Sequence, residues 1–160
     1  MDKEKISTEF LDETDIRILR VLQEDSNLTT KEISEQVNLS TTPVFERIRR
    51  LKNEGYIKKY IAVLDGDKLG LRFTVFCLVK MVHVNADIMK SFYDYVMKME
   101  EVAECYNISG EFDFLLKVNA PDMKTYRMFV LDKLGKIEEM GSIQSIFVMD
   151  EIKHTYGYNI

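Results

Sequence analysis

The sequence contains few of the residues on which catalytic and metal sites depend. Its 160 residues include two cysteines and two histidines. Neither His83 nor His154 has a Glu or Cys at the spacing of a metal-binding motif. No serine lies in the context of a nucleophile elbow, and no glycine-rich phosphate loop follows an expected strand. We therefore expect no catalytic residue, no metal ion and no cofactor, and the protein is not predicted to be an enzyme.

Long apolar segments and an N-terminal secretion signal are also absent. No stretch of the sequence is long and apolar enough to span a bilayer as a helix. Cys77 and Cys105 each lie within an apolar, strand-like run, so both are expected to be buried free thiols in a reducing compartment. These features predict a cytoplasmic protein without disulfides.

Positive charge is scarce overall and concentrated in one segment. The chain has a net charge of −5, yet six basic residues between Arg47 and Lys59 accompany a single acidic residue, Glu54. A basic segment on one helix and its C-terminal extension is typical of a surface that binds phosphates. We therefore expect double-stranded DNA as a partner, despite the acidic composition.

Two short helices joined by a tight turn are expected between residues 29 and 55. Thr29 and Glu32 have the spacing of a capping box at the start of the first helix. Ser40 is the expected N-cap of the second helix, and Pro43 falls in its first turn, where a missing N–H is tolerated. Gly55 is suited to the left-handed conformation that ends such a helix. The pattern predicts a helix-turn-helix.

The second of these helices has two chemically different faces. Val44, Ile48 and Leu51 repeat at helical spacing and are predicted to point into a core. The opposite face carries threonine, glutamate and arginine, which can reach base edges or phosphates in a recognition helix, although an ordinary solvated face has the same pattern. The candidate DNA-binding residues are Ser40, Thr41, Thr42, Glu46, Arg47, Arg49, Arg50 and Lys52.

The chain is expected to contain two domains and to have the α+β fold class. Residues 1–64 are predicted to form a three-helix (winged) helix-turn-helix domain, with a first helix capped by Asp12 and a strand or extended linker at the end. Residues 65–160 alternate strands and helices in the order βαββαβ, which indicates a ferredoxin-like domain. Strands are expected at 72–81, 102–109, 112–119 and 143–153, and helices at 86–99 and after Asp122.

The expected strands are apolar on both faces. Phe76 and Leu78 alternate with Val75 and Cys77, and Ile146 and Val148 alternate with Phe147 and Met149. Two helices can cover only one face of the sheet, so the other face is expected to meet a second copy of the chain. A homodimer that joins sheet to sheet through Phe76, Leu78, Ile146 and Val148, or through their alternating neighbours, is the simplest arrangement.

Three blocks of the sequence resemble the Lrp/AsnC (leucine-responsive/asparagine-responsive) family of transcription regulators. They are LDETDIRILRVLQED, NLSTTPVFERIRRLKNEGYIKKYIAVLD and EVAECYNISGEFDFLLKV, in this order, and the resemblance extends from Leu11 to about Lys153. It implies a DNA-binding regulator whose C-terminal domain binds small effectors, usually amino acids, and assembles dimers into octamers.

The resemblance also implies the position of the effector. In the family it lies near a Gly-x-x-Asp turn between the second and third strands, which here is Gly110 to Asp113. The family often has Gly-Asp-Tyr-Asp there, so Glu111 and Phe112 depart from the pattern. Gly110 permits a positive φ beside exposed N–H groups that can receive a carboxylate, and Asp113 can pair with an ammonium group, although a plain hairpin turn has the same residues. The candidate effector-binding residues are Asn107, Ser109, Gly110, Glu111, Phe112, Asp113, Gln144 and Ser145.

Two other functions share parts of this pattern. A ligand-independent architectural nucleoid protein would use the same helix-turn-helix without an effector. The sirohaem decarboxylases have a similar two-domain fold, but they use basic and histidine side chains in the cleft of the second domain for a tetrapyrrole. The basic recognition helix of this chain argues against that enzyme.

Overall fold

Three short helices at the start of the chain each begin at a capping residue. The structure, a computed structural model, describes residues 11–160; the first ten residues of the expected first domain lie outside the described residues. Helix α1 (Glu13–Glu24) follows Asp12 and α2 (Thr30–Gln36) follows Thr29, each with a complete capping box. Helix α3 (Thr41–Asn53) follows Ser40, which is the predicted N-cap but makes no side-chain capping bond.

The three helices bury one small apolar core. Val44, Ile48 and Leu51 of α3 are buried, as their spacing predicted. Gly55 adopts the expected positive φ, +81°, directly after the helix. Burying each such aliphatic side chain contributes about 1.5–3 kcal/mol, so the core holds α3 in place although the helix has only 13 residues. The remaining members of the core are Ile18, Ile33 and Val37.

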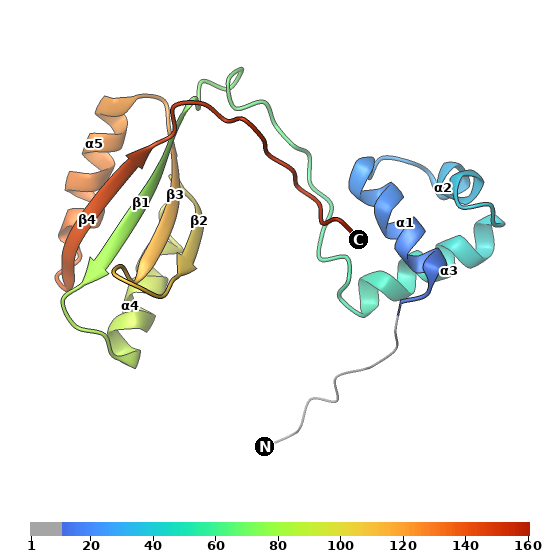
Figure 1. Cartoon of the computed structure of the whole chain (residues 1–160), viewed down its shortest axis with the longest axis horizontal. Coiled ribbons are helices and arrows are strands. Elements are labelled where there is room, and N and C mark those ends of the chain that lie inside the picture. The colour runs from blue at the N-terminus through green and yellow to red at the C-terminus, as the bar shows by residue number, and fades with distance from the viewer. Residues whose placement is uncertain (1–10) are drawn as a thin grey trace. The chain divides into compact units, whose positions relative to one another are not determined.

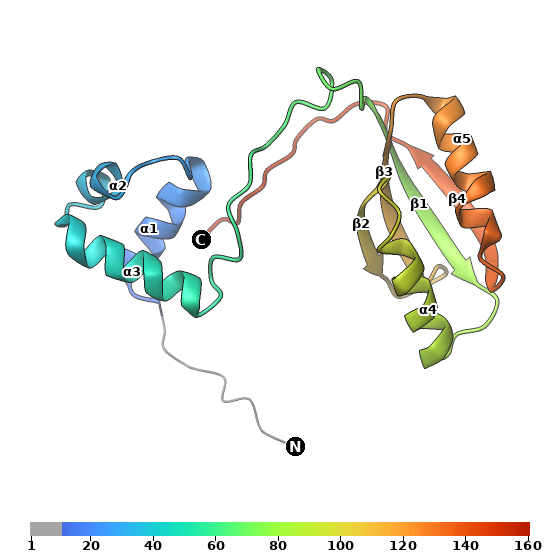
Figure 2. The same cartoon turned by 180° about the vertical axis from the view of Figure 1, so that it is seen from behind.

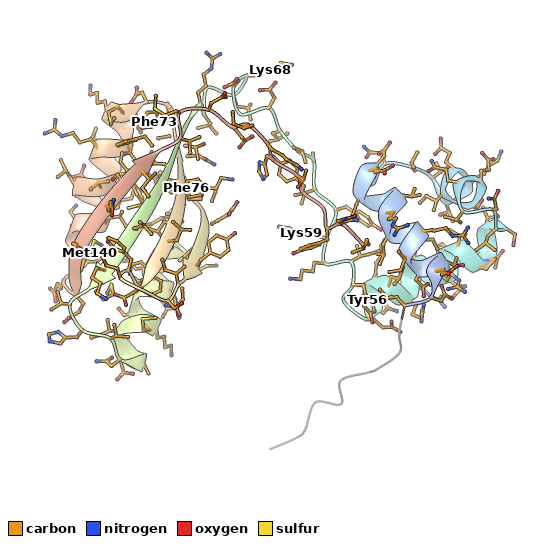
Figure 3. All side chains as sticks on the ribbon, viewed as in Figure 1. Tyr56, Lys59, Lys68, Phe73, Phe76 and Met140 are labelled. Carbon is orange, nitrogen blue, oxygen red and sulfur yellow. The ribbon has the colours of Figure 1, made fainter. Side chains whose placement is uncertain are left out.

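An extended connector follows α3, and the C-terminal segment packs with the helical unit. Residues 57–65 form neither helix nor strand, so this segment is the extended linker and not the strand, the two alternatives that were expected. Tyr56 and Lys59 are labelled in Figure 3 near its start. The described residues divide into one compact unit of residues 11–63 and 153–160 and a second of residues 64–152. This boundary lies beside the expected one at 64/65, but residues 153–160 belong to the first unit. There the Gln23 side chain donates to the main-chain oxygen of Tyr158 and accepts from its N–H, at 3.2 and 2.6 Å.

The second unit has the predicted βαββαβ order. Its strands are β1 (Phe73–Met81), β2 (Val102–Asn107), β3 (Phe114–Ala120) and β4 (Met140–Phe147). They form one sheet in the order β2-β3-β1-β4, and every neighbouring pair is antiparallel. Helices α4 (Ala86–Val96) and α5 (Met123–Asp132) lie on the same face of the sheet (Figures 1 and 2). This topology confirms the ferredoxin-like prediction.

The strand bounds differ from the prediction chiefly in two places. The last strand was expected at 143–153, but β4 covers Met140–Phe147. Met140 pairs with Met81, and past Phe147 the pairing with β1 continues only through the Val148 N–H, which donates to Thr74. The link between β2 and β3 was expected to be a two-residue turn, but it is a loop from Ile108 to Asp113. Within this loop the Ile108 N–H donates to the Asp113 main-chain oxygen, and the Asp113 N–H donates to Val79 of β1.

The two faces of the sheet differ as the alternation of residues requires. Val75, Cys77 and Val79 are fully buried beneath the helices, which excludes them from a second-copy interface. On the opposite face, Phe76 lies across from Ile146 and Leu78 lies across from Leu115; Phe76 is labelled in Figure 3. Side chains on this helix-free face are only partly buried, and Ile146 is 45% exposed. The centre of the helix-free face is therefore apolar, and no helix among residues 11–160 covers it.

The two thiols are free, but only one is buried. Cys77 lies in the core, as predicted. Cys105 is exposed, so the expectation of a second buried thiol is wrong, because β2 is the edge strand of the sheet.

Candidate functional site

The exposed side of α3 carries the candidate base-reading residues. Thr42, Glu46, Arg49 and Asn53 are all exposed, opposite the buried stripe of the helix. Arg49 pairs with Glu46 one turn earlier, and their side chains remain 62% and 49% exposed. An exposed pair of this kind contributes little to stability, so both side chains are available to a ligand. Ser40 and Thr41 at the start of the helix are exposed as well.

Arg47 and Arg50 have a different environment, because they reach back to helix α1. Arg47 donates to Asp12 at 2.6 Å and to Asp15 at 2.8 Å. Arg50 donates to the other carboxylate oxygen of Asp15 at 2.5 Å. The Asp15 side chain is only 1% exposed, and its carboxylate lies at the centre of an ionic cluster beneath α3 whose other members are partly exposed.

The protonation equilibria of this cluster follow from the same contacts. The pKa of the Asp12 carboxyl lies below its ordinary value, because it accepts from the Asp15 N–H and from the Arg47 guanidinium. The pKa values of Arg47 and Arg50 are raised, chiefly because both donate to the Asp15 carboxylate. Asp12 was predicted only as a capping residue, and Asp15 was not singled out as a site residue. Their long-range partners were missed because the sequence does not show how α1 crosses α3.

A groove of about 720 Å³ runs beside α3. It is lined by Asp12, Asp15, Pro43, Glu46, Arg47, Arg49, Arg50, Asn53 and Glu54. Lys52 is the last of the predicted DNA-binding residues on α3. Its ammonium group lies 4.6 Å from the centre of the Tyr60 ring. This cation–π contact links the end of α3 to the connector. Phe45 is 52% exposed on α3 and was not predicted as a surface residue.

The predicted effector turn is held in place by the end of strand β1. Gly110 has a φ of +125°, which favours glycine as predicted. The Asp113 carboxylate accepts from the Met81 N–H at 2.8 Å and lies 3.6 Å from the Lys80 ammonium. Asn107 donates from its side-chain amide to the Asp113 main-chain oxygen at 2.8 Å. Asp113 and Asn107 thus fix the shape of the loop with their own hydrogen bonds.

The exposed part of the turn is its backbone. Among the described residues, the main-chain N–H groups of Ser109, Gly110 and Glu111 make no hydrogen bond. Glu111 is exposed and Phe112 is half-buried. Consecutive unpaired N–H groups around a positive-φ glycine form a concave site for an anion such as a carboxylate.

Gln144 and Ser145 do not join this turn within one chain. Gln144 lies across from Leu78 on the helix-free face, whereas Ser145 lies across from Cys77 and its hydroxyl contacts the Tyr126 hydroxyl beneath α5. Adjacent strand residues point to opposite faces, so the two cannot line one cavity from the same side of the sheet. The β4 residues paired with the end of β1, next to Asp113, are Met140 and Ser142.

A separate cavity of about 450 Å³ lies between α4 and the segment that leads into β4. It is lined by Met81, Asp87, Ile88, Ser91, Phe92, Tyr95, Lys136, Ile137, Glu138 and Glu139. None of the predicted effector residues lines it. Among residues 11–160, no helix is long and apolar enough to cross a membrane, and no group of three His, Cys, Asp or Glu side chains is placed to hold a metal ion.

Comparison with known proteins connects both sites to one family. Residues 11–58 match the winged helix-turn-helix DNA-binding family, and residues 74–158 match the Lrp/AsnC ligand binding domain. The leucine-responsive regulatory protein of Escherichia coli K12 is 36% identical over 155 residues, which cover 97% of this chain and 94% of that protein.

Solved structures agree with the sequence comparison. A transcriptional regulator from Neisseria meningitidis, determined in complex with L-Met, is 39% identical with a TM-score of 0.88, covering 92% of this chain and 95% of that one. An AsnC family transcriptional regulator from Agrobacterium tumefaciens is 36% identical with a TM-score of 0.88, covering 92% and 96%. Both domains of this chain therefore have counterparts, in the same order, in characterised regulators. The chain belongs to the Lrp/AsnC family of DNA-binding transcription regulators.

Proposed function

We propose that this regulator recognises its DNA through the exposed face of α3. The observation that carries the proposal is the arrangement of Arg49 and Glu46, which are exposed together on the side opposite the core. Arginine recognises guanine through its two major-groove acceptors, and glutamate accepts from the cytosine amino group. The proposed interface is Ser40, Thr41, Thr42, Glu46, Arg49 and Lys52. The predicted Arg47 and Arg50 pair with Asp15 on the side that faces α1 and are assigned no DNA contact.

Replacing Arg49 with alanine tests this interface. The variant is expected to lose roughly 1–3 kcal/mol of binding free energy for a selected DNA site, because it loses one base contact. Fluorescence anisotropy with a labelled duplex measures the change. Arg127→Ala, at an exposed arginine on α5, removes the same charge away from α3 and is expected to bind as the wild type does. Equal affinity of the Arg49 and Arg127 variants would contradict the assignment.

The ligand of the second unit is proposed to be an amino acid, bound at the turn from Ser109 to Phe112. The related regulator from N. meningitidis was determined with L-Met, which supports this ligand class. The exposed N–H groups of the turn suit the carboxylate of an amino acid. The Asp113 carboxylate is already held by Met81 and Lys80, so the exposed Glu111 is the better partner for the ammonium group. Asn107 remains a member of the proposed site, and β4 of a neighbouring chain contributes Gln144 from its helix-free face. Ser145 is left out, because its hydroxyl contacts Tyr126 beneath α5.

The protein is proposed to act as a homodimer through the helix-free face of the sheet. A two-fold DNA site requires two recognition helices roughly 34 Å apart, which one chain cannot supply. Phe76, Leu78, Leu115 and Ile146 form the apolar centre of this face. The resemblance implied that dimers assemble into octamers. If they do so through the effector turn, a bound ligand would alter the assembly.

The two alternative functions differ in how well they fit both domains. Both domains of the chain match regulator families, which favours a regulator over a sirohaem decarboxylase. An architectural role shares the DNA interface and differs only in lacking an effector response, which the ligand experiment in the Discussion tests. We keep the predicted cytoplasmic location as part of the proposal, because the protein must reach chromosomal DNA.

A further inference from the structure

The three arginines of the recognition helix do not have equal access to a ligand. Among residues 11–160, Arg49 pairs only with the exposed Glu46, and 62% of its side chain is accessible. The side chains of Arg47 and Arg50 are 31% and 35% exposed and both reach the buried carboxylate of Asp15. Position in the sequence alone would give all three arginines the same role.

The cluster beneath α3 is electrically balanced. Two carboxylates, Asp12 and Asp15, face two guanidinium groups, Arg47 and Arg50. The carboxylates are also fixed by the start of α1, since each accepts the main-chain N–H of the other, at 2.8 and 3.2 Å. Helix N-termini favour negative charge, so the start of α1 is a suitable place for two acidic side chains.

We propose that Asp15 is a positioning residue that determines DNA specificity. It keeps Arg47 and Arg50 paired with its own carboxylate and so prevents them from binding DNA phosphates. This inference rests on the proposed function of α3. If both arginines moved to phosphates, the buried Asp15 carboxylate would be left unpaired. Unpaired buried charge costs far more than an exposed ion pair returns, so the arginines stay with Asp15.

The consequence is that α3 presents less positive charge to DNA than its sequence indicates. Binding to any DNA sequence depends on how many phosphates the protein neutralises, whereas discrimination depends on base contacts. By retaining two arginines, Asp15 limits the sequence-independent part of binding. Arg49 and Glu46 then decide which sequence is bound.

Asp15→Asn tests the proposal through the salt dependence of binding. Affinities for a selected duplex and a shuffled duplex are measured between about 50 and 200 mM salt. Each additional phosphate contact steepens the log–log slope by about 0.9. We expect the variant to bind the shuffled duplex more tightly, with a slope steeper by up to about 1.8, and to discriminate less between the two duplexes.

Glu13→Gln provides the matched control, because it removes an exposed acid from the same turn of α1. It is expected to leave the slope and the discrimination unchanged. A purely structural role of Asp15 predicts weaker binding to both duplexes with the wild-type slope, and that result would overturn the proposal.

Two further variants decide the matter even if Asp15→Asn fails to fold. Arg47→Gln and Arg50→Gln each leave Asp15 with one arginine partner. Neither is expected to change the slope, whereas Arg49→Gln should reduce it by about 0.9 if Arg49 also neutralises a phosphate. A reduction of that size in the Arg47 or Arg50 variant would refute the role of Asp15. Unchanged binding by the Arg49 variant would instead contradict the proposed function of α3.

Discussion

Leu78→Asp is expected to convert the protein to monomers and to lower its affinity for a two-fold DNA site by about 10²–10⁴-fold. Leu78 lies on β1 at the centre of the helix-free face, beside Leu115 of β3. Burying apolar side chains of this size contributes about 1.5–3 kcal/mol each, and a carboxylate in the contact adds a desolvation penalty. A dimer engages two half-sites at once, and a monomer loses that multivalent gain.

Light scattering and DNA binding measured across the same concentration series test this prediction. Leu131→Asp is the matched control, because Leu131 is 61% exposed on the outer side of α5. It introduces the same charge without reaching the helix-free face, so the control is expected to remain dimeric. A wild-type protein that is monomeric at micromolar concentration would rule out the sheet-to-sheet dimer, as would a dimer unaffected by Leu78→Asp.

Gly110→Val is expected to abolish the response to an amino acid while the dimer still binds DNA. Gly110 has a φ of +125°, and a β-branched side chain does not adopt this conformation without strain. The loop must rearrange, and its N–H groups no longer converge on a carboxylate. Calorimetric titration with the twenty amino acids first identifies the ligand of the wild type, and the variant is then titrated with that ligand.

Gly70→Val separates loss of the ligand site from general backbone strain. Gly70 also has a positive φ, +75°, and open space around it, but it lies in the turn at residues 66–70, before β1. This variant is expected to keep the ligand affinity of the wild type. If Gly110→Val still binds the amino acid with unchanged affinity, the ligand site lies elsewhere, and the cavity lined by Phe92 and Ile137 is the next location to examine. A wild type that binds no amino acid would favour the architectural alternative.

The helical unit was the easier part of the chain to predict, because its signals are local. The capping boxes at Asp12 and Thr29 and the positive φ of Gly55 depend on residues within one turn of each other. The ionic cluster is different. Asp15 and its arginine partners are 32 and 35 positions apart, and their contact depends on how two helices cross. No local pattern contains that information.

The sheet shows the same division between local and non-local information. Alternation along β1 predicted which side chains share a face, but the chain alone left open which face the helices cover. The extent of β4 was misjudged because Met149 and Ile152 continue the apolar character, although both are exposed and regular pairing with β1 stops at Phe147. Gln144 and Ser145 were assigned to one site, although the period of a strand alone places adjacent residues on opposite faces of the sheet.

The most direct test of the central claim is the ratio of affinities for two DNA sequences. A site is selected from a random pool of duplexes, and its affinity is compared with that of a shuffled duplex at one fixed salt concentration. If α3 reads base edges, the wild type should prefer the selected site by roughly 10³-fold or more, and Arg49→Ala should lose a large part of that preference. Equal affinity for the selected and shuffled duplexes would contradict sequence-specific recognition by this protein.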